Sequence, residues 1–155
     1  MMKRILKWLG LGLLAGLILI QFFPPEKNMA ALESSEDFLM LASPPDDLSA
    51  LIKKSCYDCH SNQTAYPWYS RVAPISWYLD KHIKKGKEDL NLSEYGSMDK
   101  ADKIKVLNDL YEVVEAGTMP LISYSLIHKA ARLSDEDKEA IMSWSEREAL
   151  KVMRE

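Results

Sequence analysis

Five consecutive residues, Cys56-Tyr57-Asp58-Cys59-His60, constrain this chain more than any other feature of its sequence. They hold both cysteines of the 155-residue chain and one of its three histidines. The spacing C-x-x-C-H is the attachment pattern of a c-type haem, in which each thiol forms a thioether with a haem vinyl group and the adjacent imidazole reaches the iron. We therefore predict one covalently attached haem c, with Cys56 and Cys59 as its thioether residues and His60 as the proximal iron ligand.

Three other interpretations of the cysteines compete with this one. A disulfide between them would close a very small loop, which stabilises a fold little, and would leave His60 without a role. A structural zinc site needs a fourth ligand, commonly a second paired Cys or His, and the sequence has none nearby. A thioredoxin-like C-x-x-C follows a strand in a βαβ unit, and no such pattern occurs here. A metal-free, disulfide-bonded periplasmic scaffold stays as an alternative from a different functional class.

The N-terminus is basic and then apolar. Its basic residues are Lys3, Arg4 and Lys7. Sixteen residues without a charge follow, from Trp8 to Phe23, and a snorkelling Lys7 extends the apolar stretch over residues 5–23, near the lower limit for spanning a bilayer. A cleaved signal peptide begins in the same way, but residues 21–25 offer no small residues for cleavage. We predict a membrane anchor over residues 1–23, with a signal peptide as the alternative.

The basic end of such an anchor stays in the cytoplasm, because positively charged flanks are retained inside. This orientation predicts a single-pass protein of the inner (cytoplasmic) membrane, with its N-terminus inside and its body in the periplasm or extracytoplasmic space. The lipid bilayer is then a partner through residues 5–23. The net charge of −3 gives no reason to expect nucleic acid as a partner.

The rest of the chain divides into a tether and a helical body. Residues 24–45 carry a Pro pair at each end and a Ser/Glu-rich stretch between them, and the apolar residues 38–41 could dock on the body. Residues 46–155 show helical periodicity and almost no strand pattern. We predict an all-α fold behind one N-terminal transmembrane helix.

Asp46 or Asp47 is expected to cap the first helix of the body, which places Leu48, Ile52 and Cys56 on one apolar face. A second helix is predicted from Pro74 to about Gly86, where the glycine should weaken it. A third runs from Asp99 to Ala116, with Gly117 as its stop. A short helix over residues 123–131 follows, and a last helix begins at Ser134, with Ala140, Ile141 and Trp144 pointing into the core. The alternating charges beyond Ser145 predict an end that projects or frays.

Electron-transfer haems usually carry a sixth iron ligand, and Met119 is our leading candidate for it. It lies in the loop Gly117-Thr118-Met119-Pro120, just past a predicted helix end, and a thioether ligand favours ferrous iron. Met119 could also simply fill the core, as methionines often do. His82, on the apolar face of its helix, and His128, on a short helix, are the alternative ligands, and either could instead bond a haem propionate.

Aromatic residues follow the motif closely and suit the flat face and carboxylate edges of a haem. We expect Tyr66, Trp68 and Tyr69 to contact the haem face or its propionates, and Arg71 to pair with a propionate. Ordinary core or surface roles are the alternative for each of them.

Two segments resemble the bacterial haem-binding domain family: SCYDCHSNQTAYPWYSRVAPISWYLDKHIKKGKEDLNLSEY at the start and GTMPLISYSLIHKAARLSDEDKEAIMSW at the end. The resemblance covers about residues 45–145. The family is similar in outline to small class I c-type cytochromes. The resemblance implies a cytochrome c-like domain with the thioether and proximal residues already named and Met119 as distal ligand. The family pattern has Asp and His adjacent, whereas Lys81 separates Asp80 from His82 here.

Together these features predict a membrane-anchored, exported monohaem c-type cytochrome that transfers single electrons between redox partner proteins at the membrane and is not itself an enzyme. The alternative within haem chemistry is a sensor or peroxide-handling domain whose sixth ligand is displaceable.

Overall fold

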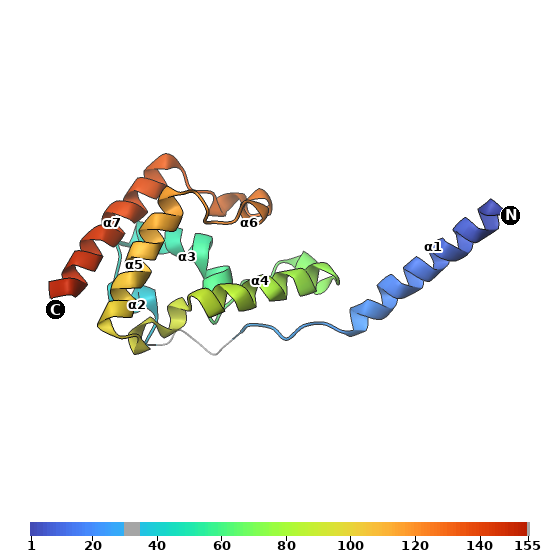
Figure 1. Cartoon of the computed structure of the whole chain (residues 1–155), viewed down its shortest axis with the longest axis horizontal. Coiled ribbons are helices and arrows are strands. Elements are labelled where there is room, and N and C mark those ends of the chain that lie inside the picture. The colour runs from blue at the N-terminus through green and yellow to red at the C-terminus, as the bar shows by residue number, and fades with distance from the viewer. Residues whose placement is uncertain (30–34, 155) are drawn as a thin grey trace.

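The computed structural model of the chain describes residues 1–29 and 35–154, and over these residues its regular elements are helices (Figure 1). The α-helices are α1 (Met2–Leu19), α2 (Phe38–Ala42), α3 (Asp46–His60), α4 (Ile75–Asp89), α5 (Lys100–Glu115), α6 (Ile122–Ile127) and α7 (Asp135–Arg154). Short 3-10 turns occur at η1 (Ile20–Phe22), η2 (Trp68–Arg71), η3 (Leu92–Ser97) and η4 (Lys129–Ala131). The prediction of an all-α fold is confirmed.

The hydrophobic core lies at the C-terminal end of the molecule, where α5 and α7 run antiparallel and pack along their length (Figure 1). Leu107 of α5 and Ile141 of α7 are fully buried there. Phe38 is also fully buried and meets the rings of Tyr95 and Trp144 edge-on, with centroids 5.0 and 5.8 Å away. Each such side chain contributes about 1.5–3 kcal/mol by leaving water, so this cluster holds α2, α5 and α7 together.

Helix α3 connects this core to the C-x-x-C-H motif. The cap expected from Asp46 or Asp47 is wrong, because Pro45 occupies the N-cap position without a side-chain hydrogen bond. Both acids lie instead in the first turn, at the positive end of the helix dipole. Leu48 and Ile52 are buried, and Cys56 packs partly buried against the same core, as the sequence predicted. The motif on the last turn of α3 therefore lies at the edge of the core, in which Tyr57 is buried.

Helix α4 packs on this last turn, and Gly86 has a different role from the one predicted. The helix does not weaken at Gly86 but continues to Asp89, and the glycine is buried. A Cβ atom on Gly86 would lie 2.6 Å from the Cys59 carbonyl oxygen and 3.2 Å from the Cys59 Cβ. The absence of a side chain thus allows α4 to contact the backbone of the motif.

The boundaries of α5 follow the sequence, because Asp99 caps the helix by accepting the Asp102 N–H at 2.8 Å and Gly117 ends it with φ of 63°. The helix predicted over residues 123–131 is in fact two, since the α6 backbone leaves helical geometry at His128 before η4 begins.

Helix α7 corrects two expectations. It does not fray beyond Ser145 but runs to Arg154, because Ala149 is buried against the core and Lys100 Nζ donates to the Met153 carbonyl at 3.0 Å. Ala140, predicted to point inward, is exposed, while its neighbour Ile141 fills the core.

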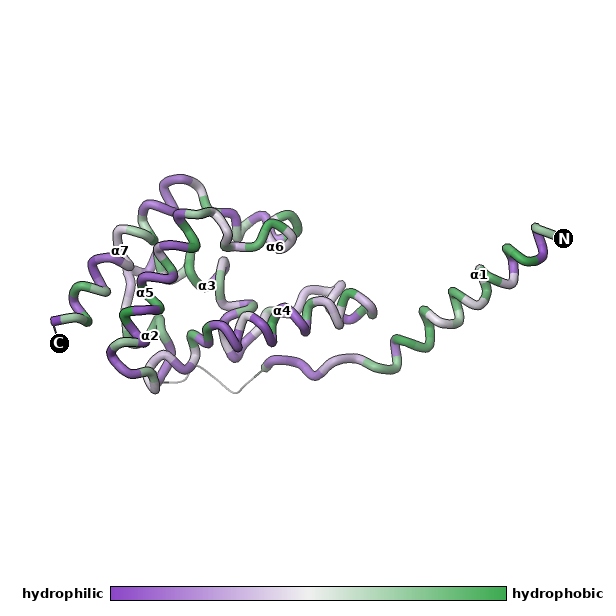
Figure 2. Tube along the Cα trace, in the orientation of Figure 1, coloured by the Kyte–Doolittle hydropathy of each residue, from purple (hydrophilic) through white to green (hydrophobic). Residues whose placement is uncertain are grey.

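At the opposite end of the molecule, α1 projects away from the body (Figure 1), and most of its length is apolar (Figure 2). Residues Met2–Phe22 have a mean hydropathy of 2.0, and none of the window is buried. By length and composition this helix can cross a membrane.

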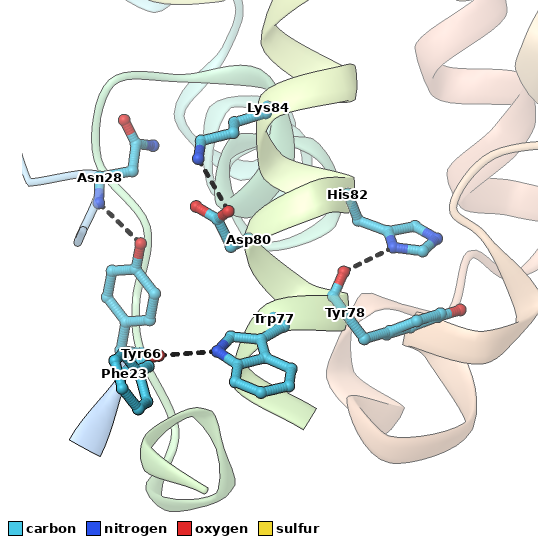
Figure 3. Close-up of polar contacts among 8 residues, drawn as sticks. All are labelled: Phe23, Asn28, Tyr66, Trp77, Tyr78, Asp80, His82 and Lys84. Carbon is cyan, nitrogen blue, oxygen red and sulfur yellow. Dashed lines mark hydrogen bonds and ion pairs between the residues drawn. The ribbon is translucent and has the colours of Figure 1, made fainter. Parts of the chain in front are cut away.

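Residues 21–29, which we call the connector, join α1 to the body through hydrogen bonds. Asn28 donates from its side chain to the Ser61 carbonyl at 2.8 Å and from its backbone to the Tyr66 hydroxyl at 2.7 Å. The Trp77 indole N–H donates to the Phe23 carbonyl at 2.8 Å (Figure 3). Within the predicted tether, Phe38 and Leu39 do dock on the core, whereas Met40 and Leu41 are exposed.

Candidate functional site

The two cysteines lie one turn apart at the end of α3, and both are free thiols. Burial, followed by the nearby Cys59, raises the pKa of Cys56 to about 12. Burial, followed by the charge of Asp58, raises the pKa of Cys59 to about 11. Both groups are therefore held as neutral thiols at neutral pH.

His60, the last residue of α3, has its ring fixed by a backbone group. Its Nδ1 lies 3.2 Å from the carbonyl oxygen of Leu90, which follows α4. A carbonyl only accepts hydrogen bonds, so Nδ1 carries the proton and donates it. Nε2 of the neutral ring then keeps its lone pair, the arrangement that metal-ligating histidines commonly have.

A cavity of about 90 Å³ opens beside Cys59, between α4 and α6. Its walls are Cys59, Tyr69, Ile75, Tyr78, Leu79, His82, Leu121, Ser123, Tyr124, Ile127 and His128. Large apolar side chains stay exposed around it: Ile75, Tyr78 and Ile127 have exposed fractions of 46%, 57% and 63%. The apolar walls and exposed rim suit a flat hydrophobic ligand.

Asp58 of the motif is hydrogen-bonded to α6, which forms one wall of this cavity. Its Oδ2 accepts the Tyr124 hydroxyl of α6 at 2.6 Å, and its Oδ1 accepts the Ala65 N–H at 3.0 Å. Burial, together with the bond to Asp58, raises the pKa of Tyr124, so the phenol stays protonated and donates. The Tyr124 ring also stacks on His128, with centroids 4.2 Å apart.

The three candidates for the sixth ligand differ in position. His82 and His128 line the cavity on opposite walls, and Met119 is half-buried in the loop two residues before the cavity residue Leu121. His82 Nδ1 donates to the Tyr78 carbonyl at 2.8 Å, which leaves its Nε2 free as in His60, whereas His128 Nε2 is hydrogen-bonded to the Tyr69 hydroxyl. The choice of Met119 stays a prediction.

Of the four residues expected around a haem, Tyr69 lines the cavity and the other three lie elsewhere. Tyr66 faces the connector, where its hydroxyl accepts the Asn28 N–H, and Arg71 is exposed beside the same segment. Trp68 is 80% exposed and contacts Tyr69 edge-on. Their contacts with a haem stay predictions.

A wider cavity of about 860 Å³ lies against the other side of Tyr124 and His128. Three lysines line it: Lys53, Lys54 and Lys129. Ammonium groups can pair with haem propionates, so these lysines are an alternative to Arg71 that the sequence did not single out.

Reasoning from the sequence assigned no role at the site to Asp58, Tyr124, Gly86 or the Leu90 carbonyl. Asp58 lies at a variable position of C-x-x-C-H, and the other three are far from the motif in sequence. Only the spacing of Tyr124 and His128 by four residues, which places both on one helix face, could have indicated a shared role.

Comparison with known proteins identifies the family of this chain. The family model of the haem-binding domain matches residues 15–147, which run from within α1 to within α7. The chain belongs to the haem-binding domain family. The haem-binding domain is also 31% identical over 100 residues to cytochrome c peroxidase Ccp of Escherichia coli (strain K12), which covers 63% of this chain and 22% of that protein. No solved structure matches it significantly.

The residues of this haem-binding domain fit a haem. The free thiols and the imidazole with an available Nε2 are the groups that covalent attachment and axial ligation require. Cys59 lines the apolar cavity, whereas Cys56 and His60 lie outside its lining. A porphyrin is larger than the cavity beside Cys59 and would also need the exposed apolar rim. Among residues 1–29 and 35–154 no group of three His, Cys, Asp or Glu side chains is placed to hold a metal ion, which leaves the zinc alternative without geometric support.

Proposed function

We propose that this haem-binding protein is a membrane-anchored, exported monohaem c-type cytochrome that carries out one-electron transfer. The observation that carries the proposal is the motif itself: two free thiols at the end of α3, followed by His60 with Nδ1 bonded to Leu90 and Nε2 available. A bound haem supplies an iron that cycles between the ferric and ferrous states. The residues of the chain attach it, orient it and limit the access of water.

Each of these tasks has its residues. Cys56 and Cys59 form the thioethers, and the Leu90 carbonyl holds the His60 ring in the orientation and tautomer that ligation needs. The apolar walls of α4 and α6 exclude water, and low polarity around the iron disfavours the more highly charged ferric state. The 21-residue apolar span of α1 and η1 would confine the protein to the inner membrane, with its body in the periplasm, and so concentrate it near redox partners there.

Covalent attachment is tested by mass and by extraction. Protein matured with haem-attachment machinery should carry the mass of one haem, which acid–acetone does not remove, and should titrate as a one-electron couple. Cys56→Ser and Cys59→Ser should each leave one thioether, and the double variant should release its haem. A matured protein with the bare polypeptide mass would contradict the proposal.

The sixth ligand is tested with a matched pair of methionines. Met119→Ala should change the ferric spectrum and lower the reduction potential, because a thioether favours ferrous iron. Met98→Ala removes a methionine that is also half-buried but packs on the core, and it should leave the spectrum unchanged. An unchanged Met119→Ala spectrum, with a changed one in His82→Ala or His128→Ala, would assign the ligand to that histidine.

A second candidate function is peroxide handling or sensing, with a displaceable sixth ligand. The name of the Escherichia coli relative favours it, as does the hydrogen-bonded pair of Tyr69 and His128 inside the cavity. The aligned region is 22% of that relative, so its whole activity does not transfer to this chain by similarity. Rapid carbon monoxide binding to the reduced protein would support this candidate, and no binding would support electron transfer.

A further inference from the structure

The connector fixes one side of the body against the end of the membrane-spanning helix. The Gln21 side-chain amide makes a paired bond with the Ala73 backbone: Nε2 donates to the Ala73 carbonyl at 3.0 Å, and Oε1 accepts the Ala73 N–H at 2.9 Å. Two residues later, the Phe23 carbonyl accepts the Trp77 indole N–H at 2.8 Å. These three bonds place the start of α4 beside the last turn of the span.

Exposed apolar side chains gather at this junction. Phe22 and Phe23 are 74% and 70% exposed, and Val72 and Trp77 are 42% and 39% exposed. We call these four residues the anchor-side face. None of them lines the cavity beside Cys59. Figure 3 shows Trp77 leaving α4 toward the connector, on the side opposite Tyr78 and His82.

The chain around the anchor-side face carries few charges. From Ser61 to Leu79 the only charged residue is Arg71, which is basic and exposed. Beside it, Glu26, Lys27 and Asp80 line the same small cavity, so the local charge is mixed and the apolar side chains carry the argument. Tryptophan is enriched at the membrane interface because its ring is apolar and its N–H is polar, and the Trp77 N–H already has its partner in Phe23.

We propose that the anchor-side face docks the body onto the lipid bilayer that α1 crosses, so that the haem domain lies on the membrane rather than swinging on a free tether. This inference rests on the proposed membrane anchoring. If α1 spans the bilayer up to Phe22, the Gln21–Ala73 bonds hold Val72 and Trp77 at the level of the headgroups, where apolar side chains insert about 5–10 Å.

Photo-crosslinking to lipid tests the docking in the full-length matured protein. The protein is reconstituted in vesicles of phosphatidylethanolamine and phosphatidylglycerol, with p-benzoylphenylalanine at one of three exposed apolar positions: Leu13 in α1, Val72 on the anchor-side face, or Leu150 on α7. Leu150 is a matched control, because it is 46% exposed and belongs to α7, which lies at the end of the molecule far from α1 (Figure 1). Mass spectrometry counts lipid adducts.

We expect adducts at positions 13 and 72, and a yield at least about fivefold lower at position 150. Gln21→Ala should lower the yield at position 72 and not at position 13, while the exposed-residue control Asn108→Ala changes neither. Adducts at 13 with a yield at 72 no higher than at 150 would overturn the docking but leave the anchor intact. A crosslinked second copy at 72 in place of lipid would also overturn it, and no adduct at 13 would overturn both the anchor and the docking.

Discussion

Tyr57 and Asp58, the two residues between the cysteines, hold the motif from two different parts of the body. The Tyr57 hydroxyl donates to Asp37 at 2.8 Å, and Asp37 caps α2 at the edge of the core. Asp58 accepts the Tyr124 hydroxyl from α6. The side chains that separate the thiols thus link the motif both to the core and to the wall of the cavity beside Cys59, which fixes the thiols relative to that wall.

The raised thiol pKa values predict slow alkylation of the folded, haem-free protein. With pKa values of about 12 and about 11 against the ordinary 9.0, the thiolate fractions at pH 8 fall roughly a thousandfold for Cys56 and a hundredfold for Cys59. Iodoacetamide labelling followed by mass spectrometry should show Cys59 reacting before Cys56, and both far more slowly than in urea. Equal rates in the folded and the urea-unfolded protein would contradict this.

The same pKa values set the sign of a pH effect on stability. Below pH 9.0 both thiols are protonated in the folded and the unfolded chain, so their contribution to the free energy of unfolding is fully present. Between pH 9.0 and about 12 the unfolded chain ionises first, and the free energy of unfolding should fall. Urea titrations of the haem-free protein at pH 8 and pH 10.5 measure this loss. The loss should be smaller in the Cys56→Ser, Cys59→Ser double variant, which keeps only the part from groups such as Tyr57 and Tyr124, whose pKa values folding also raises.

The hydroxyl of Tyr124 should be the main polar tie between α6 and α3. Tyr124→Phe removes a hydrogen bond to the Asp58 carboxylate, and bonds to charged groups contribute about 1.5–3 kcal/mol. In the matured protein we expect this variant to show faster amide exchange in α6, with little change in α5. Tyr111→Phe is the control, because the Tyr111 hydroxyl contacts only Glu115 of its own helix, at 3.5 Å. Unchanged exchange in α6 would show that stacking on His128 suffices to hold the helix.

At the scale of elements, the approach of α4 to α3 depends on Gly86. Alanine normally stabilises a helix interior by about 1 kcal/mol relative to glycine. At Gly86 the added Cβ would meet the Cys59 backbone, so Gly86→Ala should instead destabilise the protein by about 1–3 kcal/mol. Thermal unfolding measures the effect, and the neighbouring exposed Lys85→Ala serves as control. A stabilised Gly86→Ala protein would mean that α4 can shift without cost.

Gly86 also shows why some elements were predictable from sequence and others were not. The starts of α3 and α5, and the stop at Gly117, follow from residues within a few positions: Pro45, Asp99 and a glycine with positive φ. The glycine in α4 looks like a helix breaker until the distant Cys59 is beside it. Local sequence records capping and periodicity, but it does not record which backbone approaches from elsewhere in the fold.

The candidate site follows the same division. Cys56, Cys59 and His60 could be singled out from the sequence because residues this close together in the chain lie together on the last turn of α3. The Leu90 carbonyl that orients His60 is 30 residues away and carries no side-chain identity. A backbone acceptor of this kind can be found only once α4 is placed against α3.

At the scale of the whole molecule, burial is uneven. The fully buried large side chains belong to α2, α3, α5 and α7, at the end away from α1. Helix α6 has no buried residue, and α4 buries only Ser76, Ile83 and Gly86. One end of the body therefore has a complete core, whereas the cavity beside Cys59 lies between helices that bury few of their own residues.

This asymmetry predicts that the haem stabilises mainly the α4–α6 side. In the haem-free protein, amides of α6 and of the first turns of α4 should exchange at rates near those of unfolded chain, while amides of α5 and α7 stay protected by the Leu107 and Ile141 core. In the matured protein, α6 and α4 should gain protection, since covering their exposed apolar side chains stabilises the closed arrangement by about 25 cal/mol per Å². Hydrogen–deuterium exchange of both forms measures this. Protection in α6 equal to that in α5 without haem would mean that the cavity walls are held by the chain alone, through Asp58 and Tyr124.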